Sequence, residues 1–391
     1  MNNIIKALNN AKKKSNCIVL LRGYAAKNLG DDLFFDIALK RYKNTTFILE
    51  TNEVYHNSSI NKNNNLIIIP NLMPKKTIIK KAIDQMCLRL FPQIYSYIFY
   101  KQLKKRYAFV FDKIDIFLNL GGSIFIQPPY KMKTYPDLEY HNFLIENYPN
   151  KDKYFLGCNF GPYNQKKYLN GYKSIFEYSK DVCFRDLYSY ELFDKLKNVR
   201  LHPDIVFSYD ISKYKVTNQN GYGLCLINPK NRTNIKYKDY IDYYSGYIEY
   251  LLNLGENVKL FTFCKKEGDE EVANDIFASL KNKSNIEVIN YTGDIDGFLQ
   301  QYSSVEYMIC GRFHSIVLSM LFDQSILPLS YSDKMINVLK DLNYGGDILD
   351  LKTIPLDNYE RVSYKYFNGY EIGSAKKQCL KHFSNLDKKL I

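Results

Sequence analysis

The stretch Tyr307-Met308-Ile309-Cys310-Gly311-Arg312-Phe313-His314-Ser315 leads into an apolar segment, residues 316–322, with the spacing of a helix. A short apolar run that ends at glycine and continues into a helix is typical of a buried strand followed by a tight turn. Arg312 and His314 then stand at the helix start, where free backbone N–H groups attract anions. Arginine is a two-pronged donor to phosphate or carboxylate, and histidine exchanges a proton near neutral pH. The stretch predicts a strand–turn–helix unit with an anion site. A histidine with a purely structural role is the alternative interpretation.

Short apolar runs and helical patterns alternate along the whole chain of 391 residues. The predicted strands cover residues 16–22, 66–69, 114–119, 154–158, 182–184, 223–227, 257–263, 286–289, 305–310 and 325–329. The predicted helices cover residues 31–42, 76–106, 166–180, 187–196, 237–253, 268–281, 313–322 and 333–341. This alternation predicts parallel sheets with helices on both faces. We expect an α/β protein with two doubly wound, Rossmann-like domains that face each other across a cleft, and a functional site at the carboxyl ends of their strands.

The polar stretch Tyr209–Asn220 lacks apolar periodicity and marks the predicted join between the two domains. We predict an N-terminal domain over residues 1–210 and a C-terminal domain over residues 211–355. Residues 356–391 are the predicted C-terminal tail, which ends in an amphipathic helix that we expect to pack back on the N-terminal domain.

Composition narrows the class of protein. Hydrophobic residues make up 46% and charged residues 24%, as in folded rather than disordered proteins. The 8 cysteines are at least 25 residues apart, which excludes a CxxC zinc or redox site and gives no disulfide framework. No cluster has metal-ligand spacing, so we expect no metal. No apolar run reaches the roughly 18–20 residues of a membrane span, and residues 1–14 do not resemble a secretory signal, so we expect a cytoplasmic location.

Positive charge is concentrated in the first quarter of the chain. Residues 1–110 hold 19 Lys or Arg against 6 Asp or Glu, whereas the other 281 residues hold 35 of each. The densest part, from Lys75 to Arg106, has the pattern of two helices broken at Pro92, with basic side chains among bulky apolar ones. Such helices either cover a domain core with a solvated basic face or contact an anionic membrane, here its inner face. We expect no nucleic acid partner, because no zinc-finger, RRM or KH signature accompanies the charge.

Several other turns follow predicted strands and carry candidate site residues. In Asn28-Leu29-Gly30-Asp31-Asp32 an aspartate either caps the next helix or grips sugar hydroxyls. The Gly121-Gly122 pair is either a backbone wall against a ligand or a simple turn. Arg185 leaves an apolar strand where a helix begins, and it either pairs with Asp186 or binds an anion.

Three further features lie outside these turns. His141 follows the glycine pair in a Tyr-rich region and is a second candidate acid–base. Lys334, after the last predicted strand, offers another cation. The Asp294-Ile295-Asp296 segment matches the DxD of metal-dependent glycosyltransferases, but it opens a predicted helix, so N-capping is the simpler interpretation.

The ordered set of motifs resembles that of the polysaccharide pyruvyl transferase family. The shared marks are Asn28-Leu29-Gly30-Asp31-Asp32, Gly121-Gly122, Gly161-Pro162, Arg185-Asp186 with Ser189, Pro203-Asp204, Arg312-x-His314 and Tyr331 to Lys334. The resemblance implies a GT-B-like fold. It also implies transfer of the pyruvyl group of phosphoenolpyruvate onto two hydroxyls of a sugar, which forms a ketal. The implied acceptor is a sugar or lipid-linked oligosaccharide of a cell-surface polysaccharide such as a capsule or exopolysaccharide. Phosphoenolpyruvate is the co-substrate, and no cofactor is implied.

The resemblance also implies roles for individual residues. The residues expected to bind phosphoenolpyruvate, mainly on the C-terminal domain, are Arg185, Arg312, Phe313, His314 and Lys334. Those expected to bind the acceptor sugar are Asn28, Asp31, Gly121, Gly122 and Asn159. The expected catalytic residues are His314, His141 and Asp31. Two alternatives remain: a GT-B glycosyltransferase that uses a nucleotide sugar, and a non-catalytic, membrane-associated scaffold of the same fold.

Overall fold

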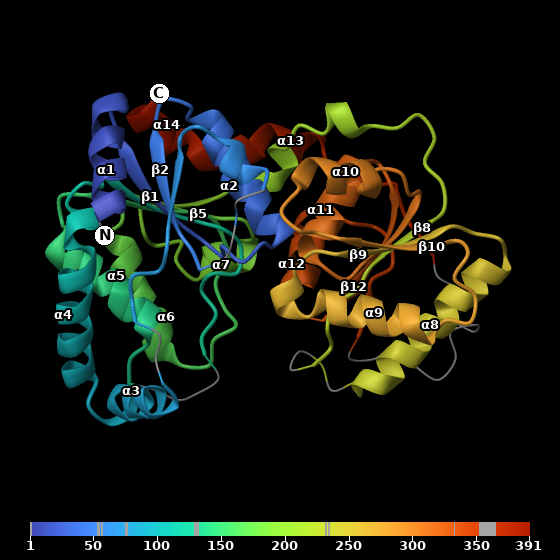
Figure 1. Ribbon diagram of the computed structural model, residues 1–391, viewed down its shortest axis with the longest axis horizontal. Coiled ribbons are helices and arrows are strands. Elements are labelled where there is room, and N and C mark those ends of the chain that lie inside the picture. The colour runs from blue at the N-terminus through green and yellow to red at the C-terminus, as the bar shows by residue number, and fades with distance from the viewer. Residues whose placement is uncertain are drawn as a thin grey trace.

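The computed structural model describes residues 2–52, 55, 58–74, 77–128, 133–230, 233, 235–331, 333–351 and 365–391. Its strands form two parallel sheets, one in each half of the chain (Figure 1). Within the described residues the first sheet has the order β3-β2-β1-β4-β5-β6-β7 and the second the order β10-β9-β8-β11-β12-β13. Both orders reverse beside the first strand of the sheet, which is the arrangement of doubly wound α/β folds. The predicted fold class is confirmed.

The strands of the first sheet are β1 (Ile18–Arg22), β2 (Thr46–Glu50), β3 (Leu66–Ile69), β4 (Ile116–Leu120), β5 (Asp152–Cys158), β6 (Asp181–Phe184) and β7 (Val199–Leu201). Those of the second sheet are β8 (Tyr222–Cys225), β9 (Val258–Thr262), β10 (Ile286–Asn290), β11 (Tyr307–Cys310), β12 (Ser325–Ser330) and β13 (Leu349–Asp350). Each predicted strand overlaps one of these. Strands β2, β7 and β13 were not predicted.

The helices of the first half are α1 (Asn2–Lys14), α2 (Leu29–Arg41), α3 (Ile78–Leu90), α4 (Pro92–Phe111), α5 (Pro136–Asn147), α6 (Lys166–Glu177) and α7 (Leu187–Glu191). Those of the second half are α8 (Tyr237–Asn253), α9 (Asp269–Ser279), α10 (Ile295–Tyr302), α11 (Phe313–Leu321), α12 (Asp333–Asp341), α13 (Gly373–Gln378) and α14 (Ser384–Leu390). As predicted, Pro92 separates two helices, because proline is tolerated in the first turn of a helix and not in its interior. The first helix, α1, was not predicted.

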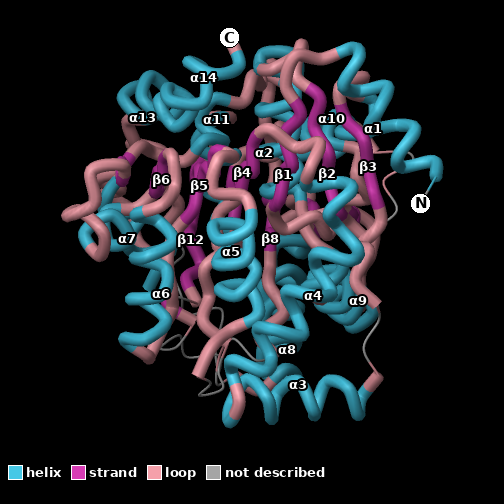
Figure 2. The backbone as a smooth tube through the Cα atoms, turned by 90° about the vertical axis from the view of Figure 1, so that its left-hand side faces the viewer, coloured by secondary structure: helices cyan, strands magenta, loops and turns pink. Residues whose placement is uncertain are grey.

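Strand β1 shows why the sheet is buried on both faces. Val19 and Leu21 pack in a core that contains Phe34 of α2, whereas Ile18 and Leu20 pack in a second core with α4 and α5. Because successive side chains of a strand point to opposite faces, a continuous apolar run fills both cores. Figure 2 shows the strands of the first sheet running alongside one another with helices before and behind them.

The C-terminal helices lie against the first half of the chain, although they follow the second sheet (Figure 1). Asp387 of α14 accepts hydrogen bonds from Arg41 at 2.8 and 2.7 Å and from Tyr42 at 2.8 Å. Of the predicted tail, only residues 365–391 are described. The domain limits at residues 210 and 355 stay predictions, and residue 355 lies outside the described residues.

No helix in the described part of the chain has the length and hydropathy needed to cross a membrane.

Candidate functional site

The candidate site lies where the carboxyl ends of the two sheets meet. Arg185 follows β6 directly, and His314 stands in the first turn of α11 after β11. Nη1 of Arg185 lies 3.3 Å from Nε2 of His314. Ligands of doubly wound sheets bind at this edge, because the rigid strands hold in place the loops that carry the functional side chains. The structure therefore brings together two residues that the sequence places 129 positions apart.

Arg185 is held in place from several directions. Nη1 donates to Oδ2 of Asp204 at 2.7 Å, and Nη2 donates to Oδ1 of Asn159 at 3.0 Å. Its guanidinium lies over the ring of Phe313, 4.3 Å from the centroid. Arg185 and Asp204 are both buried, and charge-assisted bonds of this kind fix orientation as well as charge. Contrary to one alternative in the sequence analysis, the hydrogen-bonded ion-pair partner of Arg185 is Asp204 and not the neighbouring Asp186.

Two buried donors of this cluster have no hydrogen-bond acceptor within the described residues. They are Nε of Arg185 and Nδ2 of Asn159. The two side chains line a pocket of about 40 Å³. Its other lining residues are Ser123, Asp186, Phe313, Tyr331, Met335 and Val338, so both halves contribute. Buried donors are nearly always paired, so this pocket suits an anion rich in acceptors.

The pocket is small in this conformation. It has room for water, but small-molecule sites are typically roughly 300–1,000 Å³. A ligand with several heavy atoms therefore requires the two halves, or the side chains between them, to move apart.

His314 is enclosed by residues of both halves. Its ring makes edge contacts with Phe34 at 5.4 Å and Phe313 at 5.2 Å, and Nε2 lies 3.9 Å from Oδ2 of Asp204. Because a guanidinium only donates, Nε2 accepts from Arg185, and the proton of the neutral ring is on Nδ1. Burial lowers the pKa of His314 to about 4, with the cationic Arg185 acting in the same direction and Asp204 against it. In this state the imidazole is neutral at pH 7.

Gly30 makes room for that imidazole. A Cβ added at Gly30 would lie 1.8 Å from Nδ1 and 2.4 Å from Cγ of His314. We expect Gly30→Ala to displace the ring and to lower turnover about 100-fold, because misplacing a catalytic group by about 1 Å has that effect. Turnover and circular dichroism measured together check this. Near-normal turnover with a native spectrum would contradict the assignment of His314 to the site.

Asn28 links the start of α2 to the other half. Its Oδ1 accepts from the N–H of Gly30 at 3.1 Å, and its Nδ2 donates to Oε1 of Glu267 at 3.1 Å. The alternative in which Asp31 or Asp32 caps α2 is wrong: Asn28 is the N-cap, and the two aspartates lie in the first turn. The side chain that caps an N–H in the first turn of α2 thus also bonds the other half of the chain.

The two aspartates are both buried, in different surroundings. Burial, with Glu267 and Asp32 nearby, raises the pKa of Asp31 well above its ordinary value. Asp31 lies beside Gly121, where an added Cβ would be 3.2 Å from its Oδ1. Asp32 accepts from Tyr291 of the second half at 2.6 Å and from Tyr55 at 3.0 Å. Burial raises the pKa of Asp32 to about 7, and these hydrogen bonds oppose the shift.

Arg312 is already paired. Its Nε donates to Oδ2 of Asp269 at 3.1 Å, and its Nη atoms donate to Glu267 and Asp269. Its backbone N–H donates to Oγ of Ser315 at 3.2 Å at the start of α11. Neither acidic partner was predicted, and contact between Arg312 and a ligand stays a prediction.

We expect Arg312→Ala to lower the free energy of unfolding by about 3–5 kcal/mol, because it leaves two carboxylates without their cation in a buried place. Urea denaturation checks this. Arg312→Ala together with Asp269→Asn and Glu267→Gln should recover part of the loss. A single variant as stable as the original chain would contradict this reading of the ion pairs.

The remaining predicted residues are placed as follows. Gly122 lies against Arg185: an added Cβ would be 2.4 Å from its Nη2. Ser123 donates to Oδ1 of Asn159 at 3.2 Å. His141 lies among aromatic rings, 5.2 Å from that of Phe155, and its Nε2 is 3.4 Å from Oδ1 of Asn119. Burial lowers the pKa of His141 to about 3.

Lys334 and the DxD segment complete the set. The side chain of Lys334 lies outside the described residues. Asp294 is the N-cap of α10. Asp296 accepts from Lys213 at 2.8 Å and from Tyr214. No group of His, Cys, Asp and Glu in the described residues could hold a metal ion.

Solved structures of similar fold include Anabaena HepE in complex with UDP and glucose, with a TM-score of 0.51, 9% identity, and coverage of 95% of this chain and 98% of that one. Another is the UDP-GlcNAc 2-epimerase of Methanocaldococcus jannaschii with UDP-GlcNAc and UDP, with a TM-score of 0.52, 10% identity, and coverage of 94% and 99%. S. aureus MnaA with UDP has a TM-score of 0.52, 12% identity, and coverage of 95% and 88%. At these identities the likeness shows the GT-B-like, two-domain fold alone.

Comparison with curated proteins gives no match. The model of the family described as polysaccharide pyruvyl transferase matches residues 28–333, which include the turns after β1, β4, β5, β6 and β11 that build the candidate site. The chain belongs to the polysaccharide pyruvyl transferase family.

Proposed function

We propose that the chain transfers the pyruvyl group of phosphoenolpyruvate to two hydroxyls of a sugar in a lipid-linked polysaccharide precursor. The products are a cyclic pyruvate ketal and inorganic phosphate. Family membership supports pyruvyl transfer. The observation that carries the choice of an anionic co-substrate is the pocket between the two halves, walled by Arg185 and Asn159 with two unpaired buried donors.

The pocket fits the chemistry of this substrate. Phosphoenolpyruvate has a phosphate and a carboxylate on three carbons, so it requires several donors at short range. Nε of Arg185 and Nδ2 of Asn159 supply two of them, and the N-terminus of α11 supplies backbone N–H groups. Phe313 stacks on the guanidinium and keeps its donors in the pocket wall. In this proposal Arg312 fixes the start of α11 through Asp269, and Lys334 is the second cation.

The reaction begins with a proton transfer from His314 to the methylene carbon of phosphoenolpyruvate. This carbon becomes a methyl group, and C2 becomes cation-like and is attacked by the first sugar hydroxyl. The C2–O bond to phosphate then breaks, and the phosphate leaves with its electron pair, stabilised by Arg185. The second hydroxyl adds to C2 and closes the ring. One hydroxyl proton replaces the proton given by His314, and the other leaves with the phosphate.

His314 must gain a proton for the first step, although it is neutral in the structure. Phosphate and carboxylate groups close to the ring favour the imidazolium, so binding of phosphoenolpyruvate raises the pKa of His314. Asp31 is the proposed base for a hydroxyl proton, because a carboxylate with a raised pKa is a stronger base than an ordinary one. His141 remains the second candidate for that role.

The test is release of phosphate from phosphoenolpyruvate in the presence of candidate acceptor glycans, followed by the product mass. We expect phosphate release that depends on the acceptor and a product heavier by one pyruvyl ketal. Thermal denaturation with phosphoenolpyruvate and with a panel of nucleotide sugars separates the alternatives. Stabilisation by nucleotide sugars alone would assign the chain to glycosyl transfer. Stabilisation by neither, with no phosphate release, would favour a scaffold.

A further inference from the structure

A pair of helices at one end of the molecule exposes apolar side chains. Of the 17 large hydrophobic side chains exposed within the described residues, 9 lie between Ile78 and Ile98. These are Ile78, Ile79, Ile83, Met86, Leu90, Phe91, Ile94, Tyr97 and Ile98. They belong to α3, the first part of α4 and the residue between them, a segment we call the α3–α4 arm. A contiguous apolar surface of this kind marks a binding face.

The outer face of α3 is an apolar stripe. Ile79, Ile83, Met86 and Leu90 follow one another at intervals of four, three and four residues, so they line one side of a helix with 3.6 residues per turn. Their exposed fractions are 73, 43, 50 and 50%. The only buried residues of α3 are Asp84 and Leu88, which lie on the opposite side. An ordinary amphipathic helix turns its apolar stripe inward, and α3 turns it outward.

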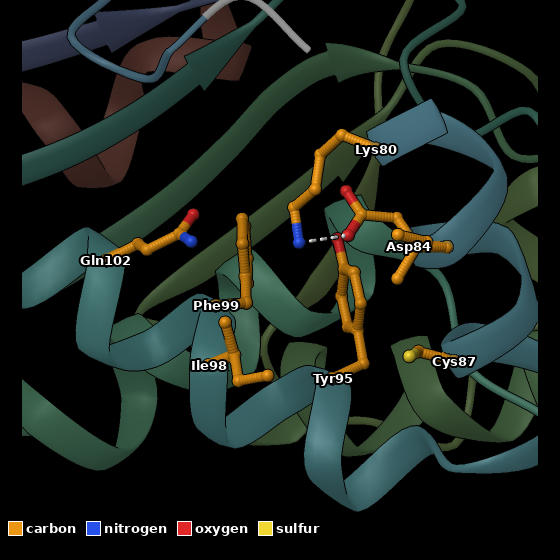
Figure 3. Close-up of a pocket in the computed structure, with 8 residues that line it drawn as sticks. Lys80, Asp84, Cys87, Tyr95, Ile98, Phe99 and Gln102 are labelled. Carbon is orange, nitrogen blue, oxygen red and sulfur yellow. Dashed lines mark ion pairs between the residues drawn. The ribbon is translucent and has the colours of Figure 1, made fainter. Parts of the chain in front are cut away.

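The face of α3 that meets α4 carries an ion pair and is already occupied. Figure 3 shows Lys80 and Asp84 of α3 paired beside Tyr95 and Phe99 of α4, and the pair is 3.0 Å long. Ile83 also lines the cavity there, of only about 50 Å³, so it stands at the border between this face and the apolar stripe. The gap between the two helices is therefore too small for a further helix or strand, and the outward stripe is the free surface.

The charge of the arm identifies the partner. Residues 77–111 hold seven Lys or Arg and one acidic residue, Asp84, which pairs with Lys80. Lys81 of α3 and Lys101 and Lys104 of α4 are exposed on the same arm and the helix that continues it. A surface that combines exposed aliphatic and aromatic side chains with an excess of cations matches the headgroup and upper acyl region of an anionic bilayer. A protein partner of ordinary composition would leave most of these cations without a counter-charge.

The arm also stands at the correct edge of the first sheet. The chain leaves the carboxyl end of β3 at Ile69 and enters α3 at Ile78, and Figures 1 and 2 both place α3 at one end of the molecule, beyond the strands. The N–H of Lys133 donates to the carbonyl of Leu88 at 3.1 Å, and its Nζ donates to that of Leu90 at 3.4 Å. Lys133 belongs to the segment that begins with Gly121 and Gly122 after β4. The arm thus leaves the sheet at the edge that carries the candidate site, and it is bonded to Lys133.

We propose that the α3–α4 arm is a membrane-docking element that inserts the stripe Ile79, Ile83, Met86 and Leu90 into the surface of an anionic bilayer. Docking there presents the carboxyl edge of the first sheet toward lipid-borne molecules. The proposal rests on exposure, spacing and charge, and it holds whether or not the chain transfers pyruvate.

The test uses the full chain and vesicles of phosphatidylcholine with or without phosphatidylglycerol, separated by sedimentation in the absence of phosphoenolpyruvate. We expect binding to the anionic vesicles, weaker binding at high salt, and little binding to the neutral ones. Ile79→Ser with Ile83→Ser and Met86→Ser should weaken binding by at least about tenfold, because much less apolar area enters the bilayer. Tyr178→Ser with Tyr250→Ser and Leu254→Ser is the matched control, since it removes three exposed large hydrophobic side chains elsewhere and should bind as the original chain does.

Three results would overturn the proposal. One is absence of binding to anionic vesicles. The second is a pair of results: the serine variant of the stripe binds in full, and Lys81→Gln with Lys101→Gln and Lys104→Gln abolishes binding. Binding would then depend on surface charge, without insertion of the stripe. The third is a dimer in light scattering that the stripe variant dissociates, because a second copy would then cover the face. None of these readouts involves phosphate release, so the docking proposal and the proposed function fail separately.

Discussion

Arg185→Lys should lower kcat/KM for phosphoenolpyruvate by about 10²–10³, the loss typical for removal of one preorganised electrostatic stabiliser. Lysine keeps the positive charge, but its single nitrogen cannot stand at the three separate positions of Nη1, which bonds Asp204, Nη2, which bonds Asn159, and the unpaired Nε of Arg185. Phosphate release at varied phosphoenolpyruvate concentration measures the effect.

The matched control is Arg200→Lys. Arg200 makes a similar fork to Asp181, with distances of 2.8 and 2.7 Å, and stands on β7 of the same sheet. It contacts the C-terminal helices through the carbonyls of Lys381 and His382 rather than the pocket. We expect its kcat/KM to change little. An equal loss in both variants would mean that Arg185 matters for the fold and not for the substrate.

His314→Gln should lower kcat by about 10²–10⁴, the usual contribution of a general acid, while KM for phosphoenolpyruvate changes far less. Glutamine can still accept a hydrogen bond from Arg185 but cannot deliver a proton to carbon. Steady-state kinetics separate the two parameters. His202→Gln is the control. Burial lowers the pKa of His202 to about 4, as it does for His314, but the ring of His202 contacts that of His382. A variant that raises KM and leaves kcat unchanged would assign His314 to binding alone.

The pH dependence gives the same residue a second test. The acid must be protonated, and in the free protein the pKa of His314 is about 4, so the reactive fraction falls as pH rises from 5 to 8. We therefore expect kcat/KM to decrease with rising pH across this range. Bound phosphoenolpyruvate stabilises the imidazolium, so the corresponding fall in kcat should lie at higher pH. Superimposable profiles for kcat and kcat/KM would contradict this coupling.

The sequence predicted the fold because most strands are apolar on both faces. It failed where the apolar pattern is short. Strand β2 has only Phe47, Ile48 and Leu49, all buried, between polar ends, and α1 has its few apolar residues between residues 4 and 11, separated by polar ones. Both patterns are too short to be recognised without the neighbours that cover them.

The residues of the site could be predicted where they directly follow a strand. The hydrogen-bond and ion-pair partners of those residues could not be predicted. The rule that carboxyl ends of parallel strands converge predicted a site in the cleft, and the family resemblance assigned Arg185 and His314 to it together. Asp204, which bonds Arg185 at 2.7 Å, was recognised only as a motif residue. Glu267 and Asp269 were missed because they stand 45 and 43 residues before Arg312, and only the packing of β9 near β11 brings them within reach.

The carboxylate of Glu267 accepts from the side chain of Asn28 through Oε1 and from that of Arg312 through Oε2. Each of these two residues stands at the start of a helix, in a different half of the chain. One side chain thus has to match two others in length and in hydrogen-bonding capacity at the same time. Positions 28, 267 and 312 should therefore have evolved together: a relative that has lost the acid at 267 should also have changed the amide at 28 or the guanidinium at 312.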